Sequence, residues 1–198
     1  MSSSSLDAMI AALKSLPGIG QKSAQRMALH LLERDQPAAR RIAETITHAL
    51  ETVRHCRQCR NFSDTHLCEI CQDDRREQQT ICVVETPADV LAVESSAAYR
   101  GRYFVLQGRL SPLDGFGPGQ LGLEELEQQL SRGGVKEVIL ATSATVEGDI
   151  TAQYIADMAA RHETVSSRLA RGIPLGGELE FVDGGTLSRA LSGRQQVD

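Results

Sequence analysis

Four of the five cysteines constrain the fold most, because their spacing defines a small closed module near the middle of the N-terminal half. Cys56 and Cys59 form one Cys-x2-Cys pair, and Cys68 and Cys71 form a second pair after a linker of eight residues. Two such pairs place four thiolates at the corners of a tetrahedron, which is the geometry that zinc prefers. Since no ligand position stays open for water, we expect one structural zinc ion, Zn2+, rather than a catalytic one.

Other uses of these cysteines stay open from the pattern alone. A redox-active dithiol pair or an iron–sulfur cluster would use the same residue type. His66 in the linker is an alternative ligand, but four cysteines complete the set, so we expect it at the surface. Residues 61–64 are predicted to form a turn. Cys82 lies in an apolar run and is expected to be a small buried side chain.

The composition indicates a globular chain with no membrane segment. Of 198 residues, 41% are hydrophobic and 24% are charged, which argues against disorder. No run approaches the roughly 18 apolar residues that a membrane-spanning helix needs. The first five residues resemble no secretory signal, so we expect a cytoplasmic, reduced protein in which disulfides are disfavoured.

Charge is distributed unevenly along the chain. Residues 1–60 carry nine Lys and Arg against five Asp and Glu, whereas residues 61–198 carry twelve against twenty-one. The basic first part therefore suits contact with phosphate, and the acidic remainder suits a different partner. Chance asymmetry on solvated surfaces would give the same numbers. Aromatic residues make up only 4%, which disfavours a base-stacking platform.

Hydrophobic periodicity predicts three helices before the cysteines, at about residues 6–13, 22–32 and 37–53. The inward positions expected on the third helix are Ile42, Ile46, Ala49 and Leu50. After the cysteines, strands are predicted at 81–84, 103–106, 138–140 and 164–166, and helices at 87–98, 124–131 and 150–161. This alternation predicts an α/β fold with a mostly parallel sheet and flanking helices. A turn-rich stretch covers residues 108–122, and residues 175–198 form a short tail with Gly-rich turns.

The break between the first two helices resembles a helix-hairpin-helix DNA-binding motif. It has the sequence Leu-Pro-Gly-Ile-Gly at residues 16–20, followed by Lys22 and Arg26. Gly18 and Gly20 allow a tight turn and close approach to a phosphate, and the next helix offers free N–H groups at its N-terminus. Such contacts neutralise phosphate without reading bases. A plain packing corner between helices would also favour glycine.

The sheet region resembles the Toprim fold of topoisomerases and primases. The resemblance is carried by Glu85 at the end of a strand and by residues 141–149, Ala-Thr-Ser-Ala-Thr-Val-Glu-Gly-Asp. In catalytic Toprim proteins an Asp-x-Asp pair joins the early Glu to hold magnesium. Here those two positions are Ser143 and Thr145, so the central pair of acids is missing. Glu147 and Asp149 remain, either for a partner or to face the dipole of a helix N-terminus.

The order of these parts resembles the RecR family of bacterial recombination mediators, and the resemblance covers nearly the whole chain. The matching stretches are residues 22–28, 108–115 and 172–180, and a departure is Ser143-Ala144, where relatives show Asn-Pro. The resemblance implies a helix-hairpin-helix module at 1–55, a four-cysteine zinc finger at 56–75, a Toprim domain at 78–174 and a C-terminal segment at 175–198. Residues 178–183 are called Walker B-like in this family, but the chain has no Walker A sequence to hold a nucleotide phosphate.

The resemblance also implies function. RecR proteins form ring-like homo-oligomers, often tetramers, that encircle DNA and act with RecO and RecF to help load RecA at gaps covered by single-strand binding protein. It implies a non-catalytic protein whose DNA contacts include Gly18, Gly20, Lys22 and Arg26. The acids Glu85, Glu147 and Asp149 would then receive RecO. The rivals are a metal-dependent Toprim nuclease or primase using these three acids, and an assembly scaffold whose hairpins only hold subunits together.

Overall fold

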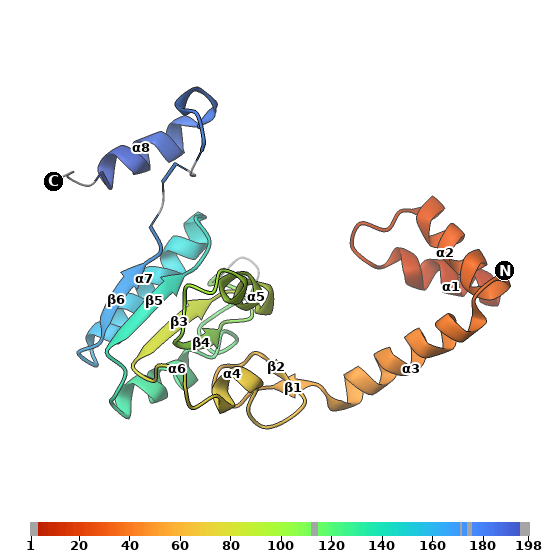
Figure 1. The fold of residues 1–198 in the computed structure, drawn as a ribbon, viewed down its shortest axis with the longest axis horizontal. Helices are drawn as coiled ribbons and strands as arrows, with labels where there is room; N and C mark the ends of the chain where they lie inside the picture. The colour runs from red at the N-terminus through yellow and green to blue at the C-terminus, as the bar shows by residue number, and fades with distance from the viewer. Residues whose placement is uncertain (1–3, 112–114, 171, 174–175, 195–198) are drawn as a thin grey trace. The chain divides into compact units, whose positions relative to one another are not determined.

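A computed structural model describes residues 4–111, 115–170, 172–173 and 176–194. The chain divides into two compact units, residues 1–53 and residues 54–198 (Figure 1). The first is entirely helical in its described part, and the second contains the cysteines and the sheet.

The helical unit consists of α1 (Ser5–Lys14), α2 (Gln21–Glu33) and α3 (Gln36–Thr52), close to the predicted spans. Ser4 begins α1, where its hydroxyl accepts from the Asp7 N–H at 3.1 Å and the Asp7 carboxylate accepts from the Ser4 N–H. This reciprocal cap satisfies backbone donors that a helix start leaves free. The core of the unit is small, with Ile10, Ala24 and Ala28 at its centre.

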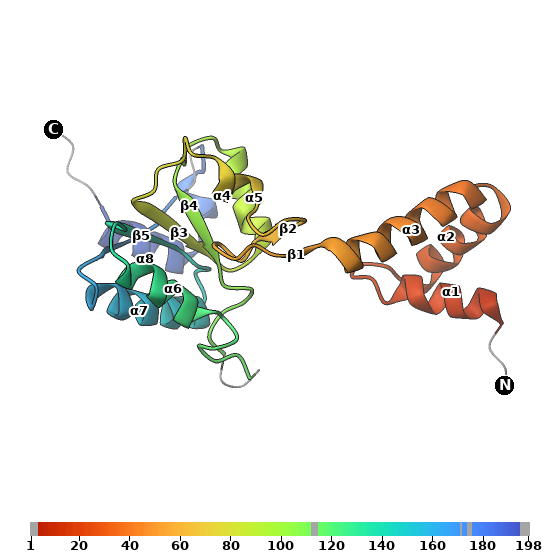
Figure 2. The same cartoon turned by 90° about the horizontal axis from the view of Figure 1, so that it is seen from below.

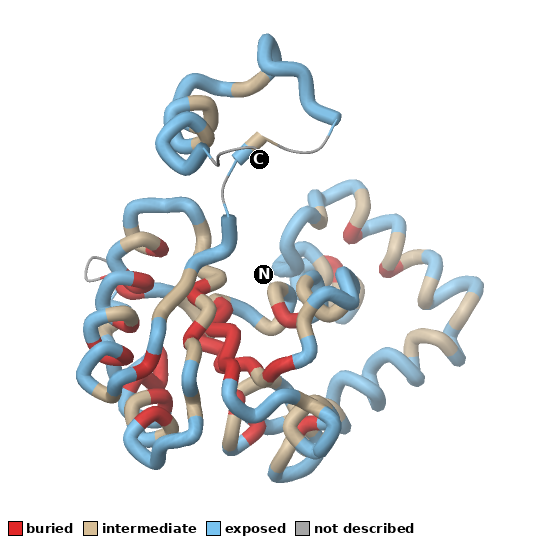
Figure 3. Tube along the Cα trace, turned by 60° about the vertical axis from the view of Figure 1, so that its left-hand side comes forward, coloured by how far each residue is buried: buried red, intermediate tan, exposed pale blue. Residues whose placement is uncertain are grey.

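The inward face predicted for α3 is wrong. Ile42, Ile46 and Leu50 are 49%, 56% and 76% exposed, and Ala49 is only half-buried. Figure 3 shows α3 without a buried position along its length. The apolar spacing correctly indicates an amphipathic helix, but α1 and α2 pack mainly on each other, so the apolar side of α3 has no cover within the described chain.

The sheet unit begins with a short antiparallel β-hairpin of β1 (Arg54–His55) and β2 (Phe62–Ser63), followed by α4 (Glu69–Gln72). The predicted turn at residues 61–64 is therefore wrong, because Phe62 and Ser63 pair with His55 and Arg54. His66 is exposed, as expected, and the β-hairpin brings the two cysteine pairs together.

A four-stranded parallel sheet forms the centre of this unit, in the order β4-β3-β5-β6. Its strands are β3 (Thr80–Val84), β4 (Arg102–Val105), β5 (Glu137–Ala141) and β6 (Val165–Arg168). All five residues of β3 are buried, which is characteristic of a central parallel strand covered on both faces. The predicted α/β fold is confirmed.

Helices cover both faces of the sheet. On one face, α6 (Leu123–Ser131) and α7 (Val146–Ala160) pack over Ile81 and Val83, and Figure 2 shows the two helices side by side. On the other face, α5 (Pro87–Ser95) and the cysteines pack over Cys82 and Val84. Successive side chains of β3 thus pack into two different cores, one on each face of the sheet.

The structure differs from the prediction at the end of α5, which is Ser95 rather than residue 98, at the start of α7 and in the C-terminal segment. Helix α7 begins at Val146 rather than near residue 150, because Thr145 caps it by accepting from the Gly148 N–H at 3.1 Å. The C-terminal segment contains more than turns, namely a 3-10 turn η2 (Leu179–Phe181) and α8 (Gly184–Ser192), which Asp183 caps. The proposed boundary between residues 174 and 175 lies outside the described residues.

Among the described residues, every helix is too short or too polar to cross a membrane.

Candidate functional site

The four cysteines converge on one point. The sulfur atoms of Cys56, Cys59, Cys68 and Cys71 all lie within 4.8 Å of one another, and the Cys59 and Cys68 sulfurs are 3.4 Å apart. Zinc–sulfur bonds of about 2.3 Å place the sulfurs of a tetrahedral site about 3.8 Å apart. The first three side chains are buried and Cys71 is half-buried. The arrangement therefore fits a closed, structural zinc ion.

Backbone hydrogen bonds shape the first cysteine pair. The Cys56 N–H donates to the Asn61 carbonyl at 2.8 Å, and the Arg60 N–H donates to the Cys56 carbonyl at 2.9 Å. The Asn61 N–H points at the Cys59 sulfur, 3.5 Å away. Closing this turn requires a left-handed backbone at Arg60, where φ is 63°. A non-glycine residue in that region is strained, which other contacts of Arg60 must offset.

The thiols influence one another strongly. Hydrogen bonds from Cys59 and Cys71 hold the pKa of Cys68 well below that of an ordinary thiol. Hydrogen bonding to Cys68 raises the pKa of Cys59, and hydrogen bonding to Cys59 and Cys68 raises that of Cys71. Four sulfurs this close cannot all carry charge alone, whereas a divalent zinc ion stabilises all four thiolates together.

Long-range contacts fasten this cluster to the sheet. The Cys59 carbonyl accepts from the Val105 N–H at 2.8 Å, and the Gln58 carbonyl accepts from the Gln129 side chain at 2.7 Å. Cys56, Cys59 and Cys68 also share an apolar cluster with Cys82, whose predicted burial is confirmed. The cysteine module is thus part of one core of the sheet unit.

Arg60 is the main residue that the sequence pattern did not reveal. Its guanidinium contacts the Glu125 carboxylate at 2.7 Å and the Gln120 carbonyl at 3.0 Å. The backbone here also needs Gly122, since a Cβ at that position would lie 1.7 Å from the Arg60 guanidinium. A contact between residues 65 positions apart leaves no local signal in the sequence.

The helical unit presents the predicted hairpin. Gly18 adopts a left-handed conformation with φ of 77°, as the tight turn requires, whereas Gly20 has an ordinary φ of −84°. Nothing lies within 4 Å of a Cβ built on either glycine. The described fold therefore has space for a side chain at Gly20, which is the N-cap of α2, a position where glycine is among the favoured residues.

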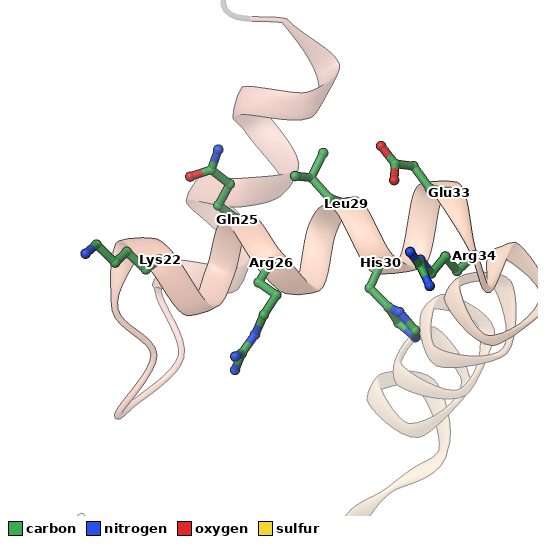
Figure 4. Close-up of a pocket in the computed structure, with 7 residues that line it drawn as sticks. All are labelled: Lys22, Gln25, Arg26, Leu29, His30, Glu33 and Arg34. Atoms are coloured by element: carbon green, nitrogen blue, oxygen red, sulfur yellow. The ribbon is translucent and has the colours of Figure 1, made fainter.

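Helix α2 starts without a side-chain cap and without an acidic residue in its first turn. Its N-terminal N–H groups and its positive dipole end are therefore available to an anion. Lys22 and Arg26 are both exposed and border one shallow hollow of about 420 Å3 (Figure 4). His30 and Arg34 border it too, and the prediction missed them although they continue the same four-residue spacing.

At the end of β3, Glu85 meets the residue that replaces the first missing aspartate. Its carboxylate accepts from both the backbone N–H and the hydroxyl of Ser143, each at 2.8 Å. Arg109 lies 3.7 Å from the other carboxylate oxygen. The hydroxyls of Ser143 and Thr145 are 3.0 Å apart, and Thr145 also caps α7. Ser143 and Thr145 stand at the two positions where catalytic Toprim proteins have aspartates, and their hydroxyls form hydrogen bonds within the protein.

The remaining acids are not gathered into a metal site. Asp149 contacts Arg168 at 2.7 Å and Arg189 at 3.9 Å, and Glu147 is half-buried in the first turn of α7. Among the described residues, the four cysteines are the only group of three or more His, Cys, Asp or Glu side chains arranged to hold a metal ion. The structure therefore brings the four cysteines together but not Glu85, Glu147 and Asp149.

Comparisons with known families match consecutive parts of the chain. Residues 6–50 match the RecR helix-hairpin-helix, residues 53–73 the RecR four-cysteine zinc finger domain, residues 79–170 the Toprim domain and residues 172–195 the RecR C-terminal region. Each sequence resemblance in the region of the hairpin, the cysteines and the sheet is thereby confirmed.

Similar curated proteins extend over the full length. A recombination protein RecR from Xanthomonas oryzae pv. oryzae is 56% identical over 195 residues, covering 98% of this chain and 99% of that protein. The RecR of Xanthomonas campestris pv. campestris is 55% identical with the same coverage. That of Xylella fastidiosa is 53% identical over 197 residues and covers both chains fully. With matches to the family's hairpin, zinc-finger and C-terminal models and identity above half along its whole length, the chain belongs to the RecR family.

Proposed function

We propose that this protein is a DNA-binding recombination mediator that acts with RecO and RecF to help load RecA at single-stranded gaps, without a catalytic step of its own. The observation that carries the proposal is the hairpin: an uncapped N-terminus of α2 beside two exposed cations, Lys22 and Arg26. This combination suits a backbone phosphate of single- or double-stranded DNA and reads no base. Action on bacterial DNA agrees with a cytoplasmic location.

Glycine at residue 20 supports the same contact. At the N-cap of α2, its φ of −84° and the open space around it would admit Ser, Thr or Asp as well as glycine. A phosphate held against the first N–H groups of α2 needs a surface without a Cβ, and this favours glycine.

The hydrogen-bonded state of Glu85 supports a non-catalytic Toprim domain. Phosphoryl transfer in such a site needs carboxylates free to hold a divalent ion. Glu85 instead accepts two hydrogen bonds from Ser143 and faces Arg109. The rival interpretation, a nuclease or primase, predicts DNA cleavage or primer synthesis with magnesium or manganese that disappears in a Glu85→Gln variant. Absence of both activities in pure, zinc-loaded protein favours the mediator.

The uncovered face of α3 supports a homo-oligomer. Ile42, Ile46 and Leu50 form an exposed apolar row with a four-residue spacing, and such a row is stable when a second copy covers it. A dimer or tetramer ring would use this kind of contact. Light scattering of wild type and an Ile46→Glu variant, with and without DNA, measures the expected loss of assembly. For RecO, we propose an acidic surface that includes Glu85, Glu147 and Asp149.

The decisive experiment is a DNA-binding titration over a range of salt concentrations. Lys22→Ala/Arg26→Ala should weaken binding at least 10-fold at low salt and flatten the salt slope by about 1.8, because each lost phosphate contact removes about 0.9. Arg40→Ala/Arg41→Ala removes the same charge from exposed positions on α3 and is the matched control. Unchanged binding in the hairpin variant, or equal loss in both variants, would contradict the proposal.

A further inference from the structure

A second basic site lies in the sheet unit rather than in the helical unit. A hollow of about 440 Å3 opens between the cysteine module, the start of β4 and the C-terminal end of α6. Three arginines from these three elements line it, namely Arg57, Arg102 and Arg132. A volume of this size suits a small ligand or part of a larger one.

No acidic side chain neutralises these arginines within the described residues. In that part of the chain, none of the three forms an ion pair with an Asp or Glu. Glu125 also lines the hollow, but its carboxylate is held by Arg60 at 2.7 Å. The C-terminus of α6 adds only a partial negative charge, beside its capping residue Arg132. The hollow therefore carries a net positive charge.

Arg102 is only partly satisfied by the protein. Its terminal nitrogen donates to the Gln78 carbonyl at 2.7 Å, while its Nε is buried and has no hydrogen-bond partner among the described residues. A guanidinium has five N–H donors, and since the Nε of Arg102 is buried, an anion in the hollow would meet its terminal N–H groups. Gln128 adds a neutral amide to the lining, and the half-buried Leu67 and Val135 provide its apolar part.

We propose that this hollow binds a phosphate group, supplied either by a DNA strand or by a free polyphosphate compound. Phosphate matches the planar, forked donors of arginine and relieves the mutual repulsion of the three cations. A cleft whose lining has a net positive charge also concentrates anions. The DNA source rests on the proposed function, whereas binding of the phosphate group does not.

The first test uses the full chain with zinc bound and pyrophosphate as the probe, measured by calorimetry. Arg57→Gln/Arg132→Gln should weaken pyrophosphate binding at least 10-fold; both side chains are exposed, so the fold is expected to persist, and circular dichroism with zinc content checks this. Arg40→Gln/Arg41→Gln, which removes the same charge from α3, should bind like wild type, and Lys22→Ala/Arg26→Ala should keep the part of pyrophosphate binding that Arg57→Gln/Arg132→Gln removes. Wild-type affinity in Arg57→Gln/Arg132→Gln, or equal loss in the α3 control, overturns the proposal.

The second test separates the sources of phosphate. If a DNA strand occupies the hollow, Arg57→Gln/Arg132→Gln flattens the salt slope of DNA binding by up to about 1.8. If that slope is unchanged while pyrophosphate binding is lost, the phosphate comes from a free compound. Failure of the hairpin variant to weaken DNA binding would count against the proposed function alone, since the hollow belongs to a different compact unit from the hairpin.

Discussion

Two places on the sheet unit have side chains of a type that binds metal ions, the four cysteines and Glu85. They differ in the partners that the rest of the protein supplies to the ligand atoms. The four cysteine sulfurs converge within 4.8 Å, and neighbouring thiols are their main partners, so only a cation satisfies them together. Glu85 lies where Toprim enzymes hold magnesium, yet protein donors occupy its carboxylate. The comparison indicates that a metal site is recognised by ligand atoms without hydrogen-bond donors from the surrounding protein, rather than by the number of acids or thiols nearby.

The largest expected effect breaks the cysteine side of this comparison. Cys59→Ser removes one ligand and leaves an incomplete, buried set that also supports Cys82. Structural zinc contributes on the order of 10 kcal/mol to folding, comparable to the whole stability of a domain, so the sheet unit should unfold or aggregate. Circular dichroism and metal analysis measure both losses.

His66→Ala is the matched control for zinc binding, because this side chain is exposed and outside the cluster. Native protein without stoichiometric zinc, or a folded Cys59→Ser variant, would refute a structural metal.

The next effect converts the second site back toward a metal site. Ser143→Asp/Thr145→Asp places one carboxylate beside Glu85 and a second next to the first, and removes the hydroxyl donor to Glu85. Repulsion at an effective dielectric of about 20 should lower the free energy of unfolding by about 2–4 kcal/mol without divalent ions. Magnesium or manganese should restore much of this loss, whereas wild type should show no response to either ion in thermal unfolding. If magnesium raised the thermal unfolding temperature of wild type, the Glu85 site would bind a metal ion as well, and the stated difference between the two sites would be wrong.

A smaller effect measures the hydrogen bond itself. Ser143→Ala keeps the backbone donor to Glu85 but removes the hydroxyl donor at 2.8 Å. Bonds to charged groups contribute about 1.5–3 kcal/mol, and partial exposure of this site favours the lower value. Chemical denaturation gives the change, with Ser192→Ala on α8 as a control whose hydroxyl, among the described residues, donates to the carbonyl of Ser188 one turn away. Equal stability of Ser143→Ala and wild type would mean that the hydroxyl does not stabilise Glu85.

The smallest effect concerns Glu94. Its carboxylate also accepts hydrogen bonds from protein donors, and it lies on the face of the sheet that carries the cysteines. Hydrogen bonds from Arg76 lower the pKa of Glu94 below its ordinary 4.5, and Tyr103 adds a donor at 2.6 Å. Because the pKa is lower in the folded state, this stabilisation is present above about pH 4.5 and is lost as the pH falls through the lowered value.

The free energy of unfolding of wild type should therefore exceed that of Glu94→Gln by about 1 kcal/mol near neutral pH, and the gap should close in acid. Both proteins carry the same cysteines, so the difference removes any contribution from zinc. Asp74→Asn, at an exposed turn, serves as the control. A difference in the free energy of unfolding that grows in acid would mean that the pKa of Glu94 is not lowered in the folded protein.

Local patterns in the sequence predicted more than long-range ones. The cysteine spacing, the buried run at β3 and the turn at Gly18 each follow from neighbouring residues and were confirmed. The face of α3 could not be predicted, because periodicity indicates an apolar side but not what covers it. The replacement of two aspartates was visible, but the use of Ser143 as a donor to Glu85 depends on two residues that are 58 positions apart in the sequence.

The position of the cysteine module within one core of the sheet has a consequence for biosynthesis. Cys71, the last of the four ligand cysteines, leaves the ribosome roughly 30 residues before Val105, the β4 residue whose N–H donates to the Cys59 carbonyl, a delay of about 2–6 s at typical rates of synthesis. During that interval the thiols have neither their sheet nor their apolar neighbours. If zinc binds during this interval, the cysteine module is folded before β3 and β4 pack against it. The supply of zinc would then affect the rate at which this protein folds.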